Sequence, residues 1–414
     1  MYHSLISTKT TGRTRVLRLP SKIHRKTRVE SIDLLRGAVM IIMALDHVRH
    51  YFHRDAFSYE PTDLSQTNGL LFFTRFITHY CAPIFIFLAG VSAYLYGAKR
   101  TRRELTFYLF TRGVWLILAE VLIITLANTF NPSYPFINLQ VIWAIGFSMI
   151  VLAAFVNLGM NWILGLALLL IAGHNLLDDF HVSGDGTFAF VWALLHDPKV
   201  FEFGRFKVSV TYPVLPWIGI IALGYFFGSF YHNHFDPPKR KKILLFTGII
   251  SVILFIVLRT INEYGDSAHW SLQKNFVFDI LSFLNVTKYP PSLLYILATL
   301  GPAMIFLALT ESPLNRQTKR IAIFGRVPFF YYMIHLYMIH FLAIIGAMIL
   351  GYHWSVMILS DKVNHSPQLA GYGFDLNMVY LIWAILILYL YPACKWFDRY
   401  KREHQSSRWW LTYL

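Results

Sequence analysis

Charged residues and cysteines are both scarce in this chain of 414 residues. Asp, Glu, Lys and Arg make up 14% of it and hydrophobic residues 56%, whereas a soluble domain usually contains about 25% charged residues. Water is therefore not expected to be the main solvent of this protein. Only Cys81 and Cys394 are present, so we expect neither a disulfide framework nor a thiolate metal site, and we predict no bound metal.

Basic residues outnumber acidic ones, 37 against 22, which gives a formal net charge of +15. Such an excess is typical of nucleic-acid-binding proteins, but these lysines and arginines form short clusters between apolar runs. We therefore expect no nucleic-acid partner and interpret the clusters as topology signals. Residues 1–29 contain no acid and superficially resemble an organelle transit peptide. We interpret them as a basic cytoplasmic tail, and the apolar run that follows, which is too long for a signal peptide, as the first span.

Apolar runs of about 20 residues, the length that crosses the hydrocarbon core of a bilayer, recur along the chain. They predict an all-α polytopic membrane protein with ten spans, near residues 34–53, 70–97, 105–128, 137–158, 160–177, 212–233, 243–262, 291–311, 322–350 and 375–397. If the spans alternate in direction, every basic cluster falls on one side, which the positive-inside rule assigns to the cytoplasm. Both termini are then cytoplasmic, with one transmembrane domain over residues 30–398 and a second tail over residues 399–414.

The long connections between the predicted spans all fall on the opposite, extracytoplasmic side under this topology. They are residues 54–69, 178–211, 263–290 and 351–374. They hold most of the loop Asp, Asn, Gly and Pro residues, so a large polar acceptor would be met there. No internal repeat is visible, which gives no support to the inverted-repeat design of many transporters.

Ionisable residues inside the predicted first span are the strongest functional signal. Such a side chain costs several kcal/mol in a bilayer unless it faces the bundle interior or water. Arg36 and His47 are eleven residues apart, so they share a helix face at a separation of about 16 Å along the axis. Asp46 lies close enough to Arg49 and His50 to orient an imidazole. The alternative is that Asp46, Arg49 and His50 only cap the outer end of the span.

Further ionisable residues occur in other predicted spans. Arg75 and His79 lie one helical turn apart in the second span. His335 and His340 in the ninth span point about 140° apart, so they cannot form a metal pair on one helix face, and at most one faces a common site. Glu120 in the third span is a candidate partner for a buried cation, either structurally or in catalysis.

Six strings in order along the chain resemble a known family, the bacterial relatives of heparan-α-glucosaminide N-acetyltransferase, a branch of the transmembrane acyltransferase superfamily. The strings are Ser31 to Gly37 with Leu45 to Arg49, Cys81 to Gly90, Leu139 to Gly146, Pro213 to Gly219, Phe283 to Leu293 and Gly325 to His335. The resemblance implies transfer of an acetyl group from cytoplasmic acetyl-CoA to an extracytoplasmic sugar or glycan. It also implies an integral protein of a bacterial inner membrane.

The resemblance implies a catalytic histidine as well. In the wider superfamily a basic residue precedes an essential histidine in the first span, and Arg36 with His47 resembles that arrangement. The heparan enzyme, in contrast, has its active histidine in the first outer loop, nearer His50 or His53. The residues expected in catalysis are therefore His47, Asp46, His53, His79 and His335.

Two further groups of residues are expected to bind substrates. The phosphates of acyl-CoA cannot cross the bilayer, so basic residues on the cytoplasmic side should hold them, unless these residues only set topology. The candidates are Arg36, Lys99, Arg100, Arg102, Arg103 and Arg112. Candidates for binding the acceptor are Arg49, Arg75, Gln140 and Lys288.

Two other classes of function remain open at this stage. A proton-coupled transporter or channel would also use buried Asp, Arg and His residues. A non-catalytic scaffold would leave these residues unexplained. The lipid bilayer is an expected partner, and a homodimer is compatible with the sequence.

Overall fold

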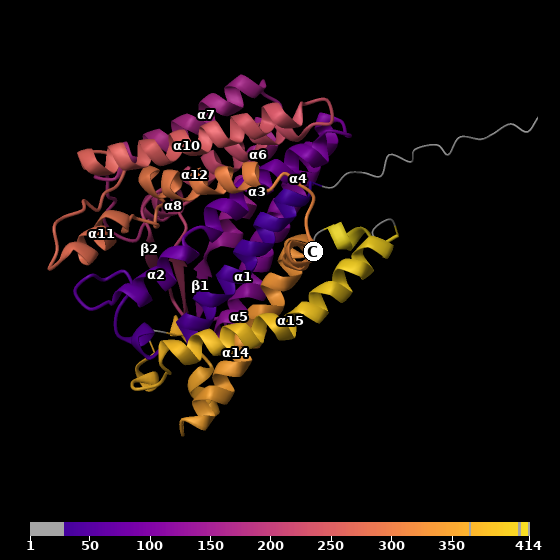
Figure 1. Ribbon diagram of the computed structural model, residues 1–414. Helices are drawn as coiled ribbons and strands as arrows, with labels where there is room; N and C mark the ends of the chain where they lie inside the picture. Colours follow the sequence, from indigo (N-terminus) through magenta and orange to yellow (C-terminus); the bar gives the residue numbers. More distant parts are fainter. Residues whose placement is uncertain (1–28, 364–365, 405–406, 413–414) are drawn as a thin grey trace, which may run out of the picture.

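The computed structural model describes residues 29–363, 366–404 and 407–412 (Figure 1). The predicted tail 1–29 therefore lies almost wholly outside the described residues. The longer helices are α1 (Glu30–Phe52), α3 (Cys81–Gly97), α4 (Arg102–Ala119), α6 (Val141–Phe155), α7 (Met160–Gly173), α9 (Leu215–Gly228), α10 (Pro237–Ile261), α12 (Leu293–Leu309), α14 (Pro328–Ile349) and α15 (Leu376–His404). Shorter helices are α2 (Gly69–Thr78), α5 (Thr125–Thr129), α8 (Thr187–Leu195), α11 (Phe276–Leu284) and α13 (Arg316–Arg326).

Six helical segments in the described part of the chain are long and apolar enough to cross a membrane. They are residues 69–97, 102–129, 160–177, 237–261, 328–349 and 376–404. Three shorter apolar helices, at residues 141–155, 215–231 and 293–309, lie between them in the sequence. The protein is thus an integral membrane protein. The count of ten spans stays a prediction, because these three helices are short and the charged residues of α1 exclude it from the six.

The prediction of an all-α fold was wrong in one detail, because a small three-stranded sheet is present. Its strands are β1 (Phe136–Leu139), β2 (Lys199–Phe203) and β3 (Phe206–Val210), in the order β1-β3-β2. β2 and β3 form an antiparallel hairpin, and β1 pairs with β3 in parallel. The hairpin forms because Gly204 adopts a φ of +59° at the turn, a backbone conformation that favours glycine. The predicted span 137–158 consequently becomes helical only at Val141.

The predicted ninth span, 322–350, is two helices rather than one. α13 ends at Arg326 and α14 begins with Pro328, because a proline disfavours helical backbone at the residue before it and suits the first turn of a new helix. α15 continues to His404, past the predicted start of the C-terminal tail at residue 399.

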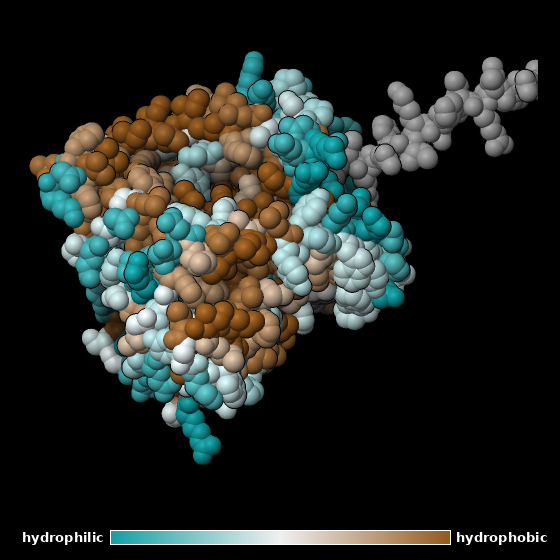
Figure 2. Space-filling view, turned by 60° about the horizontal axis from the view of Figure 1, so that its bottom comes forward, coloured by the Kyte–Doolittle hydropathy of each residue, from teal (hydrophilic) through white to brown (hydrophobic). Residues whose placement is uncertain are grey.

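α1 lies near the centre of the bundle, with α10 and α12 on one side of it and α14 and α15 on the other (Figure 1). Arg36 on α1 donates a hydrogen bond to the carbonyl of Gly325, a residue that precedes α14. Further along α1, His47 forms a hydrogen bond with His335 within α14. α1 and α14 therefore run in the same direction. Outside this core, hydrophobic residues cover broad areas of the surface, and hydrophilic residues gather in separate groups (Figure 2). Such a surface suits lipid contact.

Candidate active site

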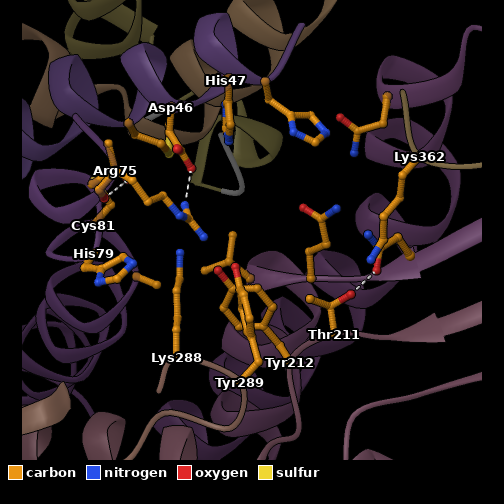
Figure 3. Close-up of a pocket in the computed structure, with 18 of the residues that line it drawn as sticks. Asp46, His47, Arg75, His79, Cys81, Thr211, Tyr212, Lys288, Tyr289 and Lys362 are labelled. Atoms are coloured by element: carbon orange, nitrogen blue, oxygen red, sulfur yellow. Dashed lines mark hydrogen bonds and ion pairs between the residues drawn. The ribbon is translucent and has the colours of Figure 1, made fainter. Parts of the chain in front are cut away.

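A cavity of about 560 Å³ lies where the C-terminal end of α1 meets the start of α3 (Figure 3). Its other walls come from β1, the start of α6, residues 211–212, the loop 285–289, α14 and residues 361–363. Most of these segments belong to the side of the bundle that the sequence predicts to be extracytoplasmic. Buried polar groups gather here while the surrounding helices remain apolar. This combination is typical of a ligand-binding site.

His47 lines this cavity and forms a hydrogen bond with His335, which is fully buried. The His47 Nδ1 lies 2.7 Å from the His335 Nε2, and the His335 Nδ1 lies 2.9 Å from the Tyr331 carbonyl oxygen. A carbonyl can only accept, so His335 must donate from Nδ1 and keep an unprotonated Nε2. His47 must then donate from its own Nδ1. The Nε2 of His47, which lines the cavity, is left as a free base.

Asp46 binds two arginines and no imidazole among the described residues. Its Oδ1 lies 2.9 Å from Arg49 and its Oδ2 lies 2.6 Å from Arg75, which reaches across from α2. Asp46 was expected to orient an imidazole or to raise its basicity. Within the described part of the chain it orients none by a hydrogen bond, because His335 occupies that position beside His47; an effect on basicity stays a prediction. Asp46, His47, Arg75 and His79 all line the one cavity, as their cost in lipid leads one to expect.

The wall facing His47 carries His79, Lys288, Tyr289 and Tyr212 (Figure 3). The His79 side chain is 4% exposed, and its Nδ1 has no hydrogen-bond partner within the described part of the chain. The rings of Tyr212 and Tyr289 meet edge to face, with centroids 5.1 Å apart. Burial raises the pKa of Tyr289, but the nearby charges of Lys288 and Arg75 more than offset this and lower it below its usual value.

Two buried charges that the sequence reasoning missed hold the loop with Lys288 and Tyr289 in place. Arg259, 1% exposed, donates to the carbonyl oxygens of Ala268, Ser282, Phe283 and Asn285. Asp266 accepts from the backbone and hydroxyl of Thr287 and from the hydroxyl of Ser292. Arg259 lies within the predicted seventh span, so the cost of a charge in the membrane was a signal that could have found it.

The remaining predicted site residues divide between the cavity and other places. Arg49, Gln140 and Lys288 line the cavity. His53 does not line the cavity. It directly follows the last residue of α1, is 4% exposed, and its Nε2 lies 3.9 Å from the Asp55 Oδ2. Glu120 is fully buried, and its Oε2 accepts a hydrogen bond of 2.9 Å from the backbone N–H of Trp143. It therefore caps the start of α6, and the expectation of a cationic partner finds no support among the described residues.

The predicted acyl-CoA residues do not line this cavity. Arg36 donates to the Gly325 carbonyl and to the Ser92 hydroxyl. Four basic residues are exposed where α3 ends and α4 begins: Lys99, Arg100, Arg102 and Arg103. Arg112 lies further along α4 and is partly buried.

Comparison with known proteins gives one match. A family model described as "Heparan-alpha-glucosaminide N-acetyltransferase, catalytic" matches residues 28–260. The match includes His47, Arg75 and His79 but ends before the loop with Lys288 and before α14. No curated protein matches the chain.

Proposed function

The chain belongs to the heparan-alpha-glucosaminide N-acetyltransferase catalytic family, and from that premise we propose that it moves an acetyl group from cytoplasmic acetyl-CoA to an extracytoplasmic sugar or glycan. The family supports a membrane acetyltransferase. The observation that carries the proposal further is the contact of His47, which lines the cavity, with His335, which bonds the Tyr331 carbonyl: when both imidazoles are neutral, this arrangement leaves the His47 Nε2 without a proton. Such an imidazole serves as a general base or as a nucleophile.

Both routes balance with the groups at hand. As a base, the His47 Nε2 takes a proton from the amine or hydroxyl of the acceptor while that atom attacks the thioester carbonyl. The carbon–sulfur bond then breaks, and the protonated His47 gives its proton to the CoA thiolate, which leaves as the free thiol. As a nucleophile, the Nε2 attacks the carbonyl first and the carbon–sulfur bond breaks to release the CoA thiolate. The acceptor then attacks the acyl-imidazole, the bond between the acyl carbon and Nε2 breaks, and the acceptor proton passes to the thiolate.

The polar and apolar parts of the cavity suit the two substrates. Met43, Ala82, Phe85 and Leu336 line it together with His47, and they offer apolar contact to an acyl group. Arg49, Arg75, Gln140 and Lys288 contribute polar groups for the acceptor. This division supports a position for the attacked carbonyl close to His47.

The nucleotide end of acetyl-CoA is expected to bind the basic residues at the ends of α1 and α3 that lie opposite the cavity. We propose that Lys99, Arg100, Arg102 and Arg103, which are exposed, bind its phosphates together with Arg36 and Arg112. A location in a bacterial inner membrane and a homodimer remain predictions.

The proposal is tested with the purified full chain in detergent, by following release of the CoA thiol from acetyl-CoA with a panel of amino sugars. His47→Ala should lower kcat by about 10²- to 10⁴-fold and leave the Kd for acetyl-CoA nearly unchanged, because a base acts mainly in the transition state. His53→Ala is the matched control and should retain turnover. Wild-type activity in His47→Ala with loss in His53→Ala would move the site to the first outer loop. Absence of any acetyl-CoA consumption by the wild type would favour the transporter class instead.

A further inference from the structure

Three cationic side chains and one carboxylate gather in one part of the cavity: Arg49, Arg75 and Lys288 with Asp46. Asp46 is shared by two cations, with Arg49 at 2.9 Å and Arg75 at 2.6 Å. Lys288 enters from the opposite side, and its amine and the Arg75 guanidinium point toward the same part of the cavity (Figure 3). Lys288 makes no ion pair within the described part of the chain. Glu60, which is exposed at the cavity rim, also acts on Arg75.

Two cations that face one another in a partly desolvated space repel strongly unless an anion lies between them. The position of Lys288 is fixed by its neighbours in the loop, because Arg259 donates to the Asn285 carbonyl and Asp266 accepts from the Thr287 backbone N–H. The His79 Nδ1, buried in the same part of the cavity, also lacks a partner among the described residues. Lys288, Arg75 and His79 all line the cavity, whose volume of about 560 Å³ is large enough for a ligand.

We propose that Lys288 and Arg75 form a subsite for one anionic group of the acceptor, a carboxylate, sulfate or phosphate carried by the sugar. That the anion belongs to the acceptor rests on the proposed function, whereas the anion site itself rests on the geometry alone. The phosphates of CoA are a poor occupant, because the cavity opens among the predicted extracytoplasmic segments. The oxyanion of the reaction is also a poor occupant, because it forms beside the His47 Nε2, which faces Lys288 across the cavity (Figure 3).

The first arm of the test compares two acceptors that differ by one sulfate group, glucosamine and glucosamine 6-sulfate, with the purified full chain. The wild type should prefer the sulfated sugar in kcat/KM. Lys288→Gln should lower this preference by about 10- to 100-fold through KM, because one charge-assisted contact is lost. Lys288→Arg should restore part of it. Lys274→Gln removes the same charge from an exposed lysine nearby and should keep the wild-type preference. An equal fall in kcat for both sugars, or a higher KM for acetyl-CoA alone, would overturn the proposal.

The second arm does not depend on turnover. The thermal unfolding temperature of each variant is measured in sulfate, in phosphate and in chloride at equal ionic strength. Wild-type protein and Lys274→Gln should gain stability in sulfate or phosphate, because ligands that bind only the folded state raise the unfolding temperature. Lys288→Gln should lose that gain. If acetyl-CoA is never consumed but this pattern holds, the proposed function fails while the anion site stands. Equal gains in all three proteins would overturn the anion site.

Discussion

At the scale of single residues, a backbone carbonyl sets the chemistry of His47. The Tyr331 carbonyl oxygen keeps the proton of a neutral His335 on Nδ1. The His335 Nε2 then accepts from His47 and keeps the proton of a neutral His47 on its Nδ1. Neither step requires a carboxylate. Asp46 is thereby left to bind both Arg49 and Arg75, so that one carboxylate is shared between two cations at the cavity.

His335 is therefore expected to act as a positioning residue for His47. His335→Phe removes the acceptor of the His47 Nδ1–H and should lower kcat by about 10- to 100-fold, the usual cost of losing such a supporting partner. The KM for acetyl-CoA should change little. His335→Gln places an amide oxygen within reach of the same N–H and should recover part of the loss. Steady-state kinetics with thermal unfolding of each variant checks this. A correctly folded His335→Phe protein with wild-type kcat would contradict it.

At the scale of secondary-structure elements, glycines let the helices around the site approach closely. A Cβ on Gly90 of α3 would lie 2.0 Å from the Ile221 carbonyl oxygen of α9, and a Cβ on Gly224 of α9 would lie 2.0 Å from the Phe87 oxygen. Gly37 and Gly325 play the same part between α1 and α13. Small residues are the usual means of close packing between membrane helices. Here they bring the helices that carry the site residues into one bundle.

Gly90→Ala should consequently destabilise the protein, because its new methyl group meets backbone that cannot rotate away. Overpacking of this kind costs about 1–3 kcal/mol or more. Gly165→Ala on α7 is the matched control, since nothing lies within 4 Å of the added Cβ. It should be neutral or stabilising by up to about 1 kcal/mol. Thermal or denaturant unfolding in detergent compares the two. Equal stability of both variants would show that α3 and α9 do not pack as described.

At the scale of the whole molecule, the sequence predicted which polar residues meet in a cavity better than it predicted their partners. His47, Arg75 and His79 were predicted to line a common cavity because a charge or an imidazole within a span is costly unless it faces the bundle interior or water. The pairing of His47 with His335, 288 residues away, could not be predicted, because helical periodicity gives directions within a helix and not distances between helices. The short sheet and the break at Val327 were missed because apolar composition alone does not separate strand, helix and turn.

The arrangement of the spans across the membrane is the remaining prediction for the whole molecule. With ten alternating spans, residue 58 follows the first span and lies outside, whereas residue 312 follows the eighth and lies inside. With only the six longest segments as spans, residues 58 and 312 would share one side.

Single cysteines at three exposed serines distinguish these topologies, because the native Cys81 and Cys394 are buried. Ser58→Cys should react with a membrane-impermeant maleimide in intact cells, and Ser312→Cys only after permeabilisation. Ser183→Cys is the positive control, because it lies outside under either count when the N-terminus is cytoplasmic. Equal behaviour of Ser58→Cys and Ser312→Cys would rule out the ten-span arrangement. The basic clusters would then no longer all lie on one side of the membrane, because Lys99 follows the first of the six segments whereas Lys319 follows the fourth.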